Sequence, residues 1–326
     1  MKIAIDAMGG DNAPLEIVKG AHLAAKKYPD VELYLIGNEN VIIDILSYYE
    51  KIDNVHIVHT DQVITMDDDP MLIMKEKSDC SMAKGLKMLK AKEIDGFISA
   101  GSTGALHSGS TLIVRKIKGI RRSAIATIIP FENPILLLDS GANPTVTADI
   151  LNQWAFLGST YMNKMLGVAN ARVGLLNNGT EEHKGTPVMQ EAYQLLQQNT
   201  NINFVGNIES RELPNSPCDV LLTDGFTGNI TLKLLEGMAK FFFGSLKRIY
   251  KKNVKTKMSF VFVKNDLKSL KNSFDASKYG GAPLLGLSKP VIKAHGSSNA
   301  ADIDNAIRQT KEFIEAKIVE QVIEAL

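Results

Sequence analysis

The stretch from Gly174 to Thr186, GLLNNGTEEHKGT, carries the densest group of side chains that could do chemistry. An apolar run gives way there to a loop rich in ionisable groups. Within it Lys184, an ammonium among small residues, could bind phosphate or stabilise a developing oxyanion. A surface salt bridge to Glu181 or Glu182 explains the same lysine equally well. His183, the next residue back, is a less favoured candidate for a general acid.

The polar turn from Asp224 to Asn229, DGFTGN, is the second candidate, since a helix is predicted to begin near Ile230. The Asn229 amide either caps this helix or faces a substrate. The sequence offers no Ser–His or Cys–His pair beside these two loops. Positioning and charge stabilisation are therefore favoured over a covalent intermediate on the enzyme.

Glycine-rich polar loops follow three predicted strands. AMGGD follows Lys2–Asp6, AGSTG follows Gly96–Ser99, and SGAN follows Ile135–Asp139. Glycine lets backbone N–H groups approach a ligand closely, which suits phosphate or another oxyanion. Each loop alone is explained by a tight turn between a strand and a helix. Several such loops at one sheet edge indicate an anion site.

Several common motifs are absent. The stretches Gly104–Thr111 and Gly174–Thr180 approach the P-loop pattern but lack the lysine after the second glycine, so nucleotide hydrolysis is not expected. No GxGxxG or GxSxG string occurs, which disfavours a dinucleotide ligand and a serine hydrolase. The six histidines show no HExxH spacing, and the acidic run Asp67–Asp69 is predicted to be a solvated loop. We therefore predict neither a metal nor a cofactor.

Alternating strands and helices must position these loops. Short β-branched runs, each followed by an amphipathic stretch, predict a largely parallel sheet covered on both faces, with ligands at the carboxyl ends of its strands. The predicted strands are Lys2–Asp6, Glu32–Ile36, Gly96–Ser99, Ile135–Asp139, Arg172–Leu176 and Val220–Thr223. The stretch Leu151–Met165 has the spacing of a core helix. Because no repeat or linker interrupts the chain, we expect one α/β domain over residues 1–326.

Composition narrows the class of partner and compartment. The 37 basic and 36 acidic residues nearly cancel, so a nucleic-acid partner is not expected. Two distant cysteines, Cys80 and Cys218, fit a reducing compartment. The N-terminus runs directly into a strand pattern and no apolar run approaches the length of a membrane span. These features predict a cytoplasmic protein.

Basic residues flank an apolar patch between Lys247 and Lys271, where Asp266 is the one acidic residue. The patch, Met258–Val263, suits the surface of an anionic membrane. The residues predicted to contact the membrane are Phe260, Val261, Phe262 and Val263. An alternative is a solvated helical hairpin, at about residues 240–275, whose apolar tip packs on a second copy of the chain.

Seven strings carry a family resemblance. They are IDAMGGDNAP, SAGSTGAL, LLDSGAN, RVGLLNNGTEEHKG, DGFTGN, YGGAPLLG and HGSS, in this order and spread over nearly the whole chain. Together they resemble the signature blocks of the phosphate acyltransferase (PlsX) family. The sequence departs from the usual pattern at Ser102 and Thr186, where asparagine is common, and at Asn178, where an apolar residue is common. These departures do not change the reaction class that the resemblance implies, and the resemblance assigns no detailed role to Ser102 or Thr186.

The resemblance implies a Rossmann-like α/β/α fold akin to the isocitrate and isopropylmalate dehydrogenases and phosphotransacetylases, and a homodimer. It implies acyl-acyl carrier protein and inorganic phosphate as substrates, and acyl phosphate for phospholipid synthesis as product. It also implies peripheral association with the inner face of the cell membrane and a downstream membrane glycerol-3-phosphate acyltransferase. In the family a lysine and an asparagine that match Lys184 and Asn229 are associated with activity. The carrier protein is acidic, so the basic stretches Arg115–Arg122 and Lys247–Lys271 are its candidate landing areas, with an ordinary solvated face as the alternative.

The loops and the resemblance together give a set of predicted substrate- and phosphate-binding residues. These are Asp6, Gly9, Gly10, Asp11, Gly101, Ser102, Thr103, Gly104, Asn143, Gly179, Thr180, His183, Asp224, Thr227, Gly228, Gly281, His295 and Ser297. Two rival interpretations are a dehydrogenase of the isopropylmalate type, which would need a nucleotide and normally a metal, and a non-catalytic membrane-associated scaffold that retains a phosphate pocket.

Overall fold

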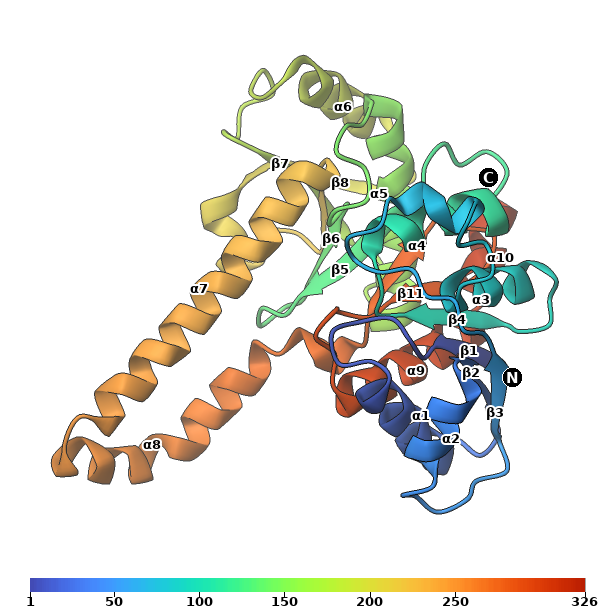
Figure 1. Ribbon diagram of the computed structural model, residues 1–326. Helices are drawn as coiled ribbons and strands as arrows, with labels where there is room; N and C mark the ends of the chain where they lie inside the picture. The colour runs from blue at the N-terminus through green and yellow to red at the C-terminus, as the bar shows by residue number, and fades with distance from the viewer. Residues whose placement is uncertain (326) are drawn as a thin grey trace. The chain divides into compact units, whose positions relative to one another are not determined.

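The computed structural model describes residues 1–325, apart from the side chains of residues 272 and 273. Strands alternate with helices along the chain, as Figure 1 shows, which confirms the predicted α/β class. The chain divides into two compact units. Unit 1 comprises Met1–Thr127, Phe156–Asn170 and Ser277–Leu326, and unit 2 comprises Ile128–Ala155 and Ala171–Ala276. That residues 1–326 form one domain stays a prediction.

Unit 1 contains a sheet with the strand order β3-β2-β1-β4-β11-β10-β5. The first five strands are parallel, and β10 runs antiparallel to both of its neighbours. The strands are β1 (Lys2–Asp6), β2 (Glu32–Gly37), β3 (Val55–His59), β4 (Gly96–Ser99), β5 (Ala124–Ile129), β10 (Ala282–Leu285) and β11 (Val291–Lys293). The helices are α1 (Leu15–Lys27), α2 (Glu39–Leu46), α3 (Ser81–Lys90), α4 (Thr103–Gly109), α9 (Ala300–Glu315) and α10 (Ile318–Ala325).

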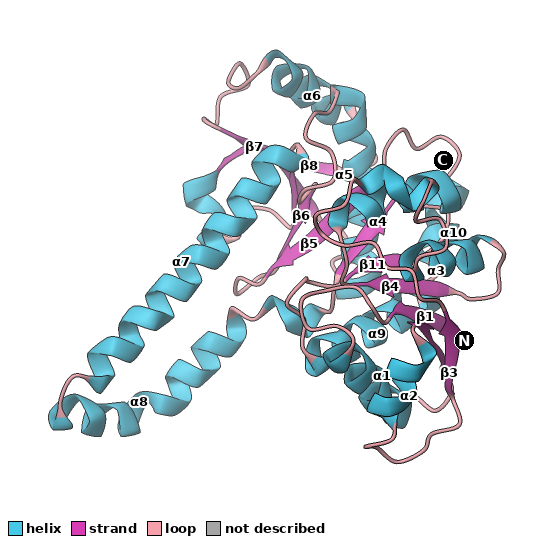
Figure 2. Cartoon of the chain, viewed as in Figure 1, coloured by secondary structure: helices cyan, strands magenta, loops and turns pink. Residues whose placement is uncertain are grey.

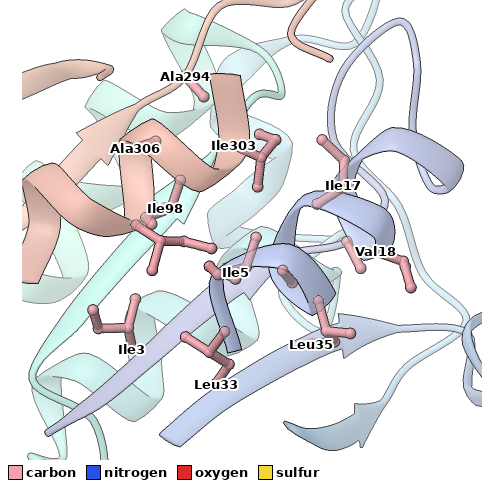
Figure 3. Packing of buried hydrophobic residues seen from close by; sticks show 14 of the residues in the cluster. Ile3, Ile5, Ile17, Val18, Leu33, Leu35, Ile98, Ala294, Ile303 and Ala306 are labelled. Carbon is pink, nitrogen blue, oxygen red and sulfur yellow. The ribbon is translucent and has the colours of Figure 1, made fainter. Parts of the chain in front are cut away.

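The core of unit 1 forms where one face of the sheet meets α1 and α9. Figure 3 shows Ile5 of β1 and Ile98 of β4 pointing toward Ile17 of α1 and Ile303 of α9. Successive strand residues point to opposite faces, so Asp6 and Ser99, one position further on, face away from this apolar cluster. The carboxyl ends of β1 and β4 therefore present polar side chains on the face of the sheet opposite the apolar cluster.

Unit 2 contains four parallel strands in the order β6-β9-β7-β8. The strands are β6 (Ile135–Leu138), β7 (Arg172–Asn177), β8 (Asn203–Glu209) and β9 (Val220–Leu222), and α6 (Pro187–Gln198) connects β7 to β8. Leu137, Leu176 and Leu221 form part of their buried core. The predicted core helix is α5 (Ala148–Leu166), in which Trp154 is fully buried, as its spacing predicted.

Two long helices of unit 2, α7 (Gly225–Lys251) and α8 (Val254–Ser273), form a helical hairpin. Figure 2 shows α7 leading away from the strands of unit 2 and α8 returning from the turn. The hairpin confirms the predicted element but begins earlier than residue 240, because α7 continues without interruption from the turn after β9. Among the residues that the structure describes, no helix combines the length and the apolarity needed to cross a bilayer.

Candidate active site

Three polar residues end three neighbouring strands of unit 1. Asp6 ends β1, Ser99 ends β4 and Lys293 ends β11, and the strand register pairs Lys293 with Ser99. All three are buried. The Ser99 hydroxyl donates to Asp6 Oδ2 at 2.7 Å, and it accepts from the Gly101 N–H at 3.0 Å. The carboxyl edge of this sheet therefore carries a connected row of polar side chains.

Burial raises the pKa of the Asp6 carboxyl, although hydrogen bonds from Ser81, Ser99 and the backbone of Met8 and Gly9 act in the opposite direction. Desolvation disfavours the ionised form more than these donors favour it. Asp6 thus serves as an acceptor that fixes the surrounding turns.

Glycines allow the loops of unit 1 to touch. A methyl group on Gly9 would lie 2.4 Å from Asp6 Oδ2 and 2.8 Å from the Gly101 nitrogen, so only glycine fits there. The N–H of Asp11 donates to the Gly296 carbonyl at 2.8 Å. The loops after β1, β4 and β11 therefore come together at the sheet edge. The Gly101 N–H is occupied by Ser99, so this glycine serves loop packing in the structure.

The remaining predicted residues of unit 1 have structural partners of their own. Ser102 caps α4 by accepting from the Ala105 N–H, and Thr103 and Gly104 form the first turn of that helix. The His295 ring and the Ser297 hydroxyl lie 2.9 Å apart. Gly280 and Gly281 precede β10, and a methyl group on Gly281 would lie 2.6 Å from the Lys293 carbonyl oxygen. A phosphate-binding role for these residues, with Gly10 and Asp11, stays a prediction.

Sequence reasoning missed Lys293. Its Nζ donates to the Ala100 carbonyl at 3.2 Å and to the Ala294 carbonyl, and burial lowers its pKa to about 8, against the opposing charges of Asp6 and Asp11. The signal in the sequence was a lysine at the end of an apolar run, directly before the AHGSS loop.

Lys184 lies in a loop that two asparagines hold in place. Asn177 Nδ2 donates to the Lys184 carbonyl and to Asn207 Oδ1, each at 3.1 Å. Asn207 Nδ2 in turn donates to the Glu181 carbonyl at 2.9 Å. Gly185 has a φ of 87°, and a methyl group there would lie 2.5 Å from Asn177 Oδ1. Asn177 ends β7 and Asn207 lies within β8. Both are positioning residues that the sequence pattern did not indicate.

The Lys184 ammonium remains unpaired. The side chain is half-buried, and Gly179 lies so close that a methyl group there would be 2.8 Å from Lys184 Cγ. Neither Glu181 nor Glu182 forms an ion pair with it, and within residues 1–325 its Nζ has no hydrogen-bond partner. The salt-bridge alternative is therefore not seen.

Asn229 lies in the second turn of α7, so it does not cap that helix. Asp224 is the cap, since its Oδ1 accepts from the Thr227 N–H at 2.8 Å and its Oδ2 accepts from the Thr227 hydroxyl at 2.7 Å. The half-buried Asn229 side chain lies against Gly141, and its amide forms no hydrogen bond to any residue that the structure describes. The amide is thus free to meet a ligand.

The start of α7 packs tightly on the loop after β6. Asp139 accepts from the Asn143 N–H at 2.6 Å and from Asn143 Nδ2 at 2.9 Å, while the Gly225 N–H donates to the Asn143 carbonyl at 2.7 Å. A methyl group on Gly228 would lie 2.0 Å from the Asp139 carbonyl oxygen. Buried Asn143 and Gly228 therefore fix the angle at which α7 leaves the sheet, and with it the place of Asn229.

Lys184 and Asn229 follow adjacent strands. β7 and β9 pair in parallel, with Leu175 opposite Leu222, and the two loops leave their carboxyl ends. Thr180 and His183 are exposed in the first loop, where the His183 carbonyl accepts from Gln190. Unit 2 thus carries the unpaired Lys184 ammonium and the unpaired Asn229 carboxamide at the edge where ligands bind to parallel sheets.

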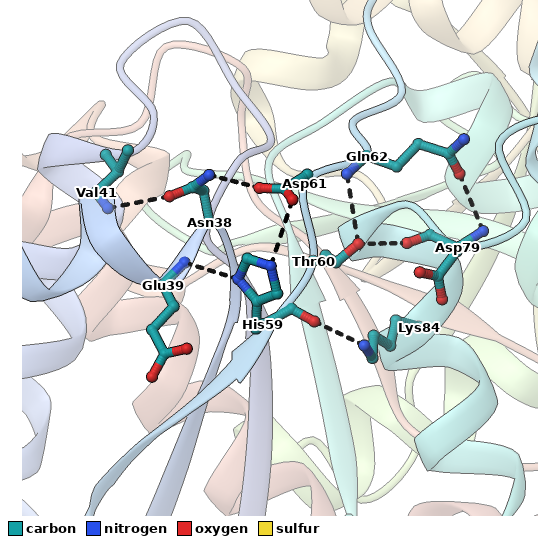
Figure 4. A network of polar contacts seen from close by, with 9 residues as sticks. All are labelled: Asn38, Glu39, Val41, His59, Thr60, Asp61, Gln62, Asp79 and Lys84. Atoms are coloured by element: carbon teal, nitrogen blue, oxygen red, sulfur yellow. Dashed lines mark hydrogen bonds and ion pairs between the residues drawn. The ribbon is translucent and has the colours of Figure 1, made fainter.

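A further polar cluster in unit 1 has a structural explanation. Asn38 caps α2 and donates to Asp61 at 2.6 Å, and His59 lies 3.4 Å from Asp61 while its Nδ1 accepts from the Glu39 N–H (Figure 4). Thr60 donates to the Asp79 carbonyl at 2.6 Å. The network ties the loop after β3 to its neighbours. In the described part of the chain, no group of three or more His, Cys, Asp or Glu side chains could hold a metal ion.

Comparison with known proteins identifies the family. Residues 1–321 match the family model described as a fatty acid synthesis protein. The phosphate acyltransferase of Pediococcus pentosaceus is 46% identical over 99% of this chain and 93% of its own length. That of Oceanobacillus iheyensis is 46% identical over 98% and 95%. The chain belongs to the phosphate acyltransferase family. It is an acyltransferase, and its reaction is an acyl transfer that involves phosphate.

A solved structure supports the fold assignment. A phosphotransacetylase from Streptococcus pyogenes superposes with a TM-score of 0.63 at 18% identity and covers 98% of this chain and 94% of its own. At this identity the likeness shows the fold alone, and it confirms the predicted fold, which phosphotransacetylases share. Family membership sets aside the two rivals, the dehydrogenase and the non-catalytic scaffold.

Proposed function

We propose that this enzyme transfers a fatty acyl group reversibly from acyl-acyl carrier protein to inorganic phosphate and so supplies acyl phosphate for phospholipid synthesis. The observation that carries the proposal is the pair of unpaired side chains, Lys184 and Asn229, after adjacent strands of unit 2. An ammonium suits the anion that attacks, and a carboxamide N–H suits the oxyanion that develops.

The chemistry needs little acid–base assistance. Inorganic phosphate is an anion throughout the neutral range, and a substantial share of it is dianionic, so a phosphate oxygen can attack with little help from a base. A phosphate oxygen forms a bond to the thioester carbonyl carbon, the carbon–sulfur bond breaks, and the thiolate leaves and takes a proton. Thiols have a pKa of about 8.5, so the thiolate is a competent leaving group. Positioning by Lys184 and charge stabilisation by Asn229 therefore suffice.

Phosphate-dependent release of the carrier-protein thiol tests this proposal. We expect Asn229→Ala to lower kcat by about 100- to 1,000-fold, the usual cost of removing one oxyanion donor. Lys184→Met should cause a loss of similar size with a raised KM for phosphate. Lys233→Met and Asn201→Ala, at exposed positions of unit 2, are the matched controls. Folded Lys184 and Asn229 variants that produce acyl phosphate at the wild-type rate would contradict the assignment.

Peripheral binding at the inner face of the membrane and a homodimer belong to the same proposal. The tip of the hairpin exposes apolar side chains among lysines, and Phe262 is 83% exposed. Phe260 packs on Tyr250, with ring centroids 5.3 Å apart, so Phe260 also supports the hairpin itself. An exposed apolar tip with a basic flank suits an anionic bilayer, where a membrane glycerol-3-phosphate acyltransferase would consume the product.

The acidic carrier protein needs a basic landing area. The exposed residues Arg115, Lys118, Arg121 and Arg122 cluster near the start of β5, and the basic helices of the hairpin are the alternative. We propose that one of these two surfaces receives the carrier.

A further inference from the structure

Lys293 is a buried cation to which the proposed chemistry gives no role. Its side chain is 9% exposed, and lysine is almost never buried unless it is paired. Within the residues that the structure describes, no carboxylate lies within 4 Å of its Nζ. The ammonium donates to two backbone carbonyls, those of Ala100 and Ala294. Removing an ammonium from water is unfavourable, so the burial of Lys293 requires a structural or functional reason.

The two carbonyls belong to different loops. Ala100 begins the loop after β4, and Ala294 begins the loop after β11. The same loops meet a third one, since a methyl group on Gly10 would lie 2.9 Å from Ala100 Cβ and 3.0 Å from the Gly296 carbonyl oxygen. One ammonium thus bridges the turns that the sequence predicts to bind phosphate.

We propose that Lys293 is a positioning residue whose ammonium ties the loop after β4 to the loop after β11 and so holds the glycine turns of unit 1 ready for phosphate. Only the effect of this tether on catalysis rests on the proposed function. The tether itself is a property of the fold. Loss of the ammonium leaves two carbonyls without this donor and allows the loops to separate.

The charge of this tether depends on pH. Burial lowers the pKa of Lys293 to about 8, while Asp6 from β1 and Asp11 from the following loop favour the charged form. Cys80, the N-cap of α3, interacts with Asp6, and burial raises the pKa of its thiol, so the thiol remains uncharged. Lys293 is therefore mostly charged at pH 7 and about one-tenth charged at pH 9. The bridge weakens as the pH rises through about 8.

The test is kcat/KM for phosphate between pH 6.5 and 9.5, measured for wild type, Lys293→Arg, Lys293→Met and the control Lys289→Met. We expect wild type and the control to lose about tenfold between pH 7 and 9 relative to Lys293→Arg, because arginine stays charged. Lys293→Met should be impaired at pH 7 and should lack this alkaline decline. Parallel profiles for all four proteins, or wild-type activity of Lys293→Met at pH 7, would overturn the proposal.

A second arm covers the case in which arginine does not fit. Asp11 is exposed, and Asp11→Asn removes a charge that favours the ammonium, so its alkaline decline should begin at lower pH than that of wild type. Hydrogen-exchange protection of residues 99–104 and 294–298 should also fall in Lys293→Met and remain in Lys289→Met. Unchanged exchange protection in Lys293→Met, together with an alkaline decline in Asp11→Asn at the same pH as in wild type, would refute the tether. A wild-type enzyme that releases no thiol with phosphate, yet shows the exchange result, would refute the proposed function and leave the tether standing.

Discussion

The buried ammonium of Lys293 makes the stability of the protein depend on pH in a defined direction. We consider Lys293→Met, which keeps an unbranched stem and removes the charge. The pKa falls from 10.5 to about 8 on folding, and each unit corresponds to about 1.4 kcal/mol, so burying the charged form costs about 3 kcal/mol. This cost is fully present below pH 8.

The sign follows from proton counting. Between pH 8 and 10.5 the unfolded chain keeps a proton on Lys293 that the folded protein has released, so the free energy of unfolding of wild type rises with pH in this window. Burial raises the pKa of Tyr161 and of Cys218 to about 12, which lowers stability at alkaline pH. Both proteins share these two groups. The difference between wild type and Lys293→Met isolates the lysine.

Guanidinium unfolding of both proteins at pH 7, 8, 9 and 10 measures this difference. The free energy of unfolding of wild type should rise by about 2–3 kcal/mol relative to Lys293→Met between pH 7 and 10. The offset at any single pH also contains the loss of the two hydrogen bonds to Ala100 and Ala294, so only the slope is decisive. A difference that stays constant over this range would refute the reasoning.

Two further predictions concern α7 and the hairpin tip. Asp224→Ala removes the N-cap of α7 and should cost about 1 kcal/mol in the free energy of unfolding, measured in urea, whereas Asp224→Asn should cost little; equal losses would contradict the cap. Phe262→Ser should weaken binding to anionic vesicles by about tenfold or more, because burial of a phenylalanine contributes about 1.5–3 kcal/mol, while Val205→Ser on β8 should not. Salt-sensitive binding that persists in Phe262→Ser would count against insertion of the tip.

Much of the sheet could be predicted because several of its strands are β-branched runs that end in glycine or a small polar residue. Lys2–Asp6 and Gly96–Ser99 have the predicted bounds, and Ile135–Leu138 differs by one residue. Five strands of the described residues were missed: β3, β5, β8, β10 and β11. β10 and β11 are short, Pro283 lies within β10, and Lys293 ends the apolar run of β11. Pairing with neighbours distant in sequence stabilises them, which a local pattern does not reveal.

The division into two units also had no local signal. The chain passes from one unit to the other four times: within β5, within α5, between Asn170 and Ala171, and between Ala276 and Ser277. Two of these crossings lie inside regular secondary structure, and the third lies in the short loop between α5 and β7. A search for flexible, Pro- or Gly-rich boundaries could therefore find none.

For the site, residue type and loop position pointed to Lys184 and Asn229, but the alternatives required coordinates. The helix cap is Asp224, and no acid among the residues that the structure describes pairs with Lys184. The sequence does not show which polar side chains are buried. Lys293 resembles any lysine that ends a strand until its neighbours are placed, and Asn177 gains its role only through Asn207, from a different strand.

The proposed mechanism requires direct attack of phosphate on the thioester, and a rapid-quench experiment in which phosphate is added last tests this step. Wild-type enzyme is mixed with a stoichiometric amount of acyl-acyl carrier protein, and free thiol and the mass of the enzyme are measured before and after phosphate is added. If phosphate attacks directly, no thiol and no acylated enzyme form until phosphate is present, and equal amounts of thiol and acyl phosphate then appear. A burst of thiol equal to the enzyme, with an acyl group attached to the protein, would contradict it.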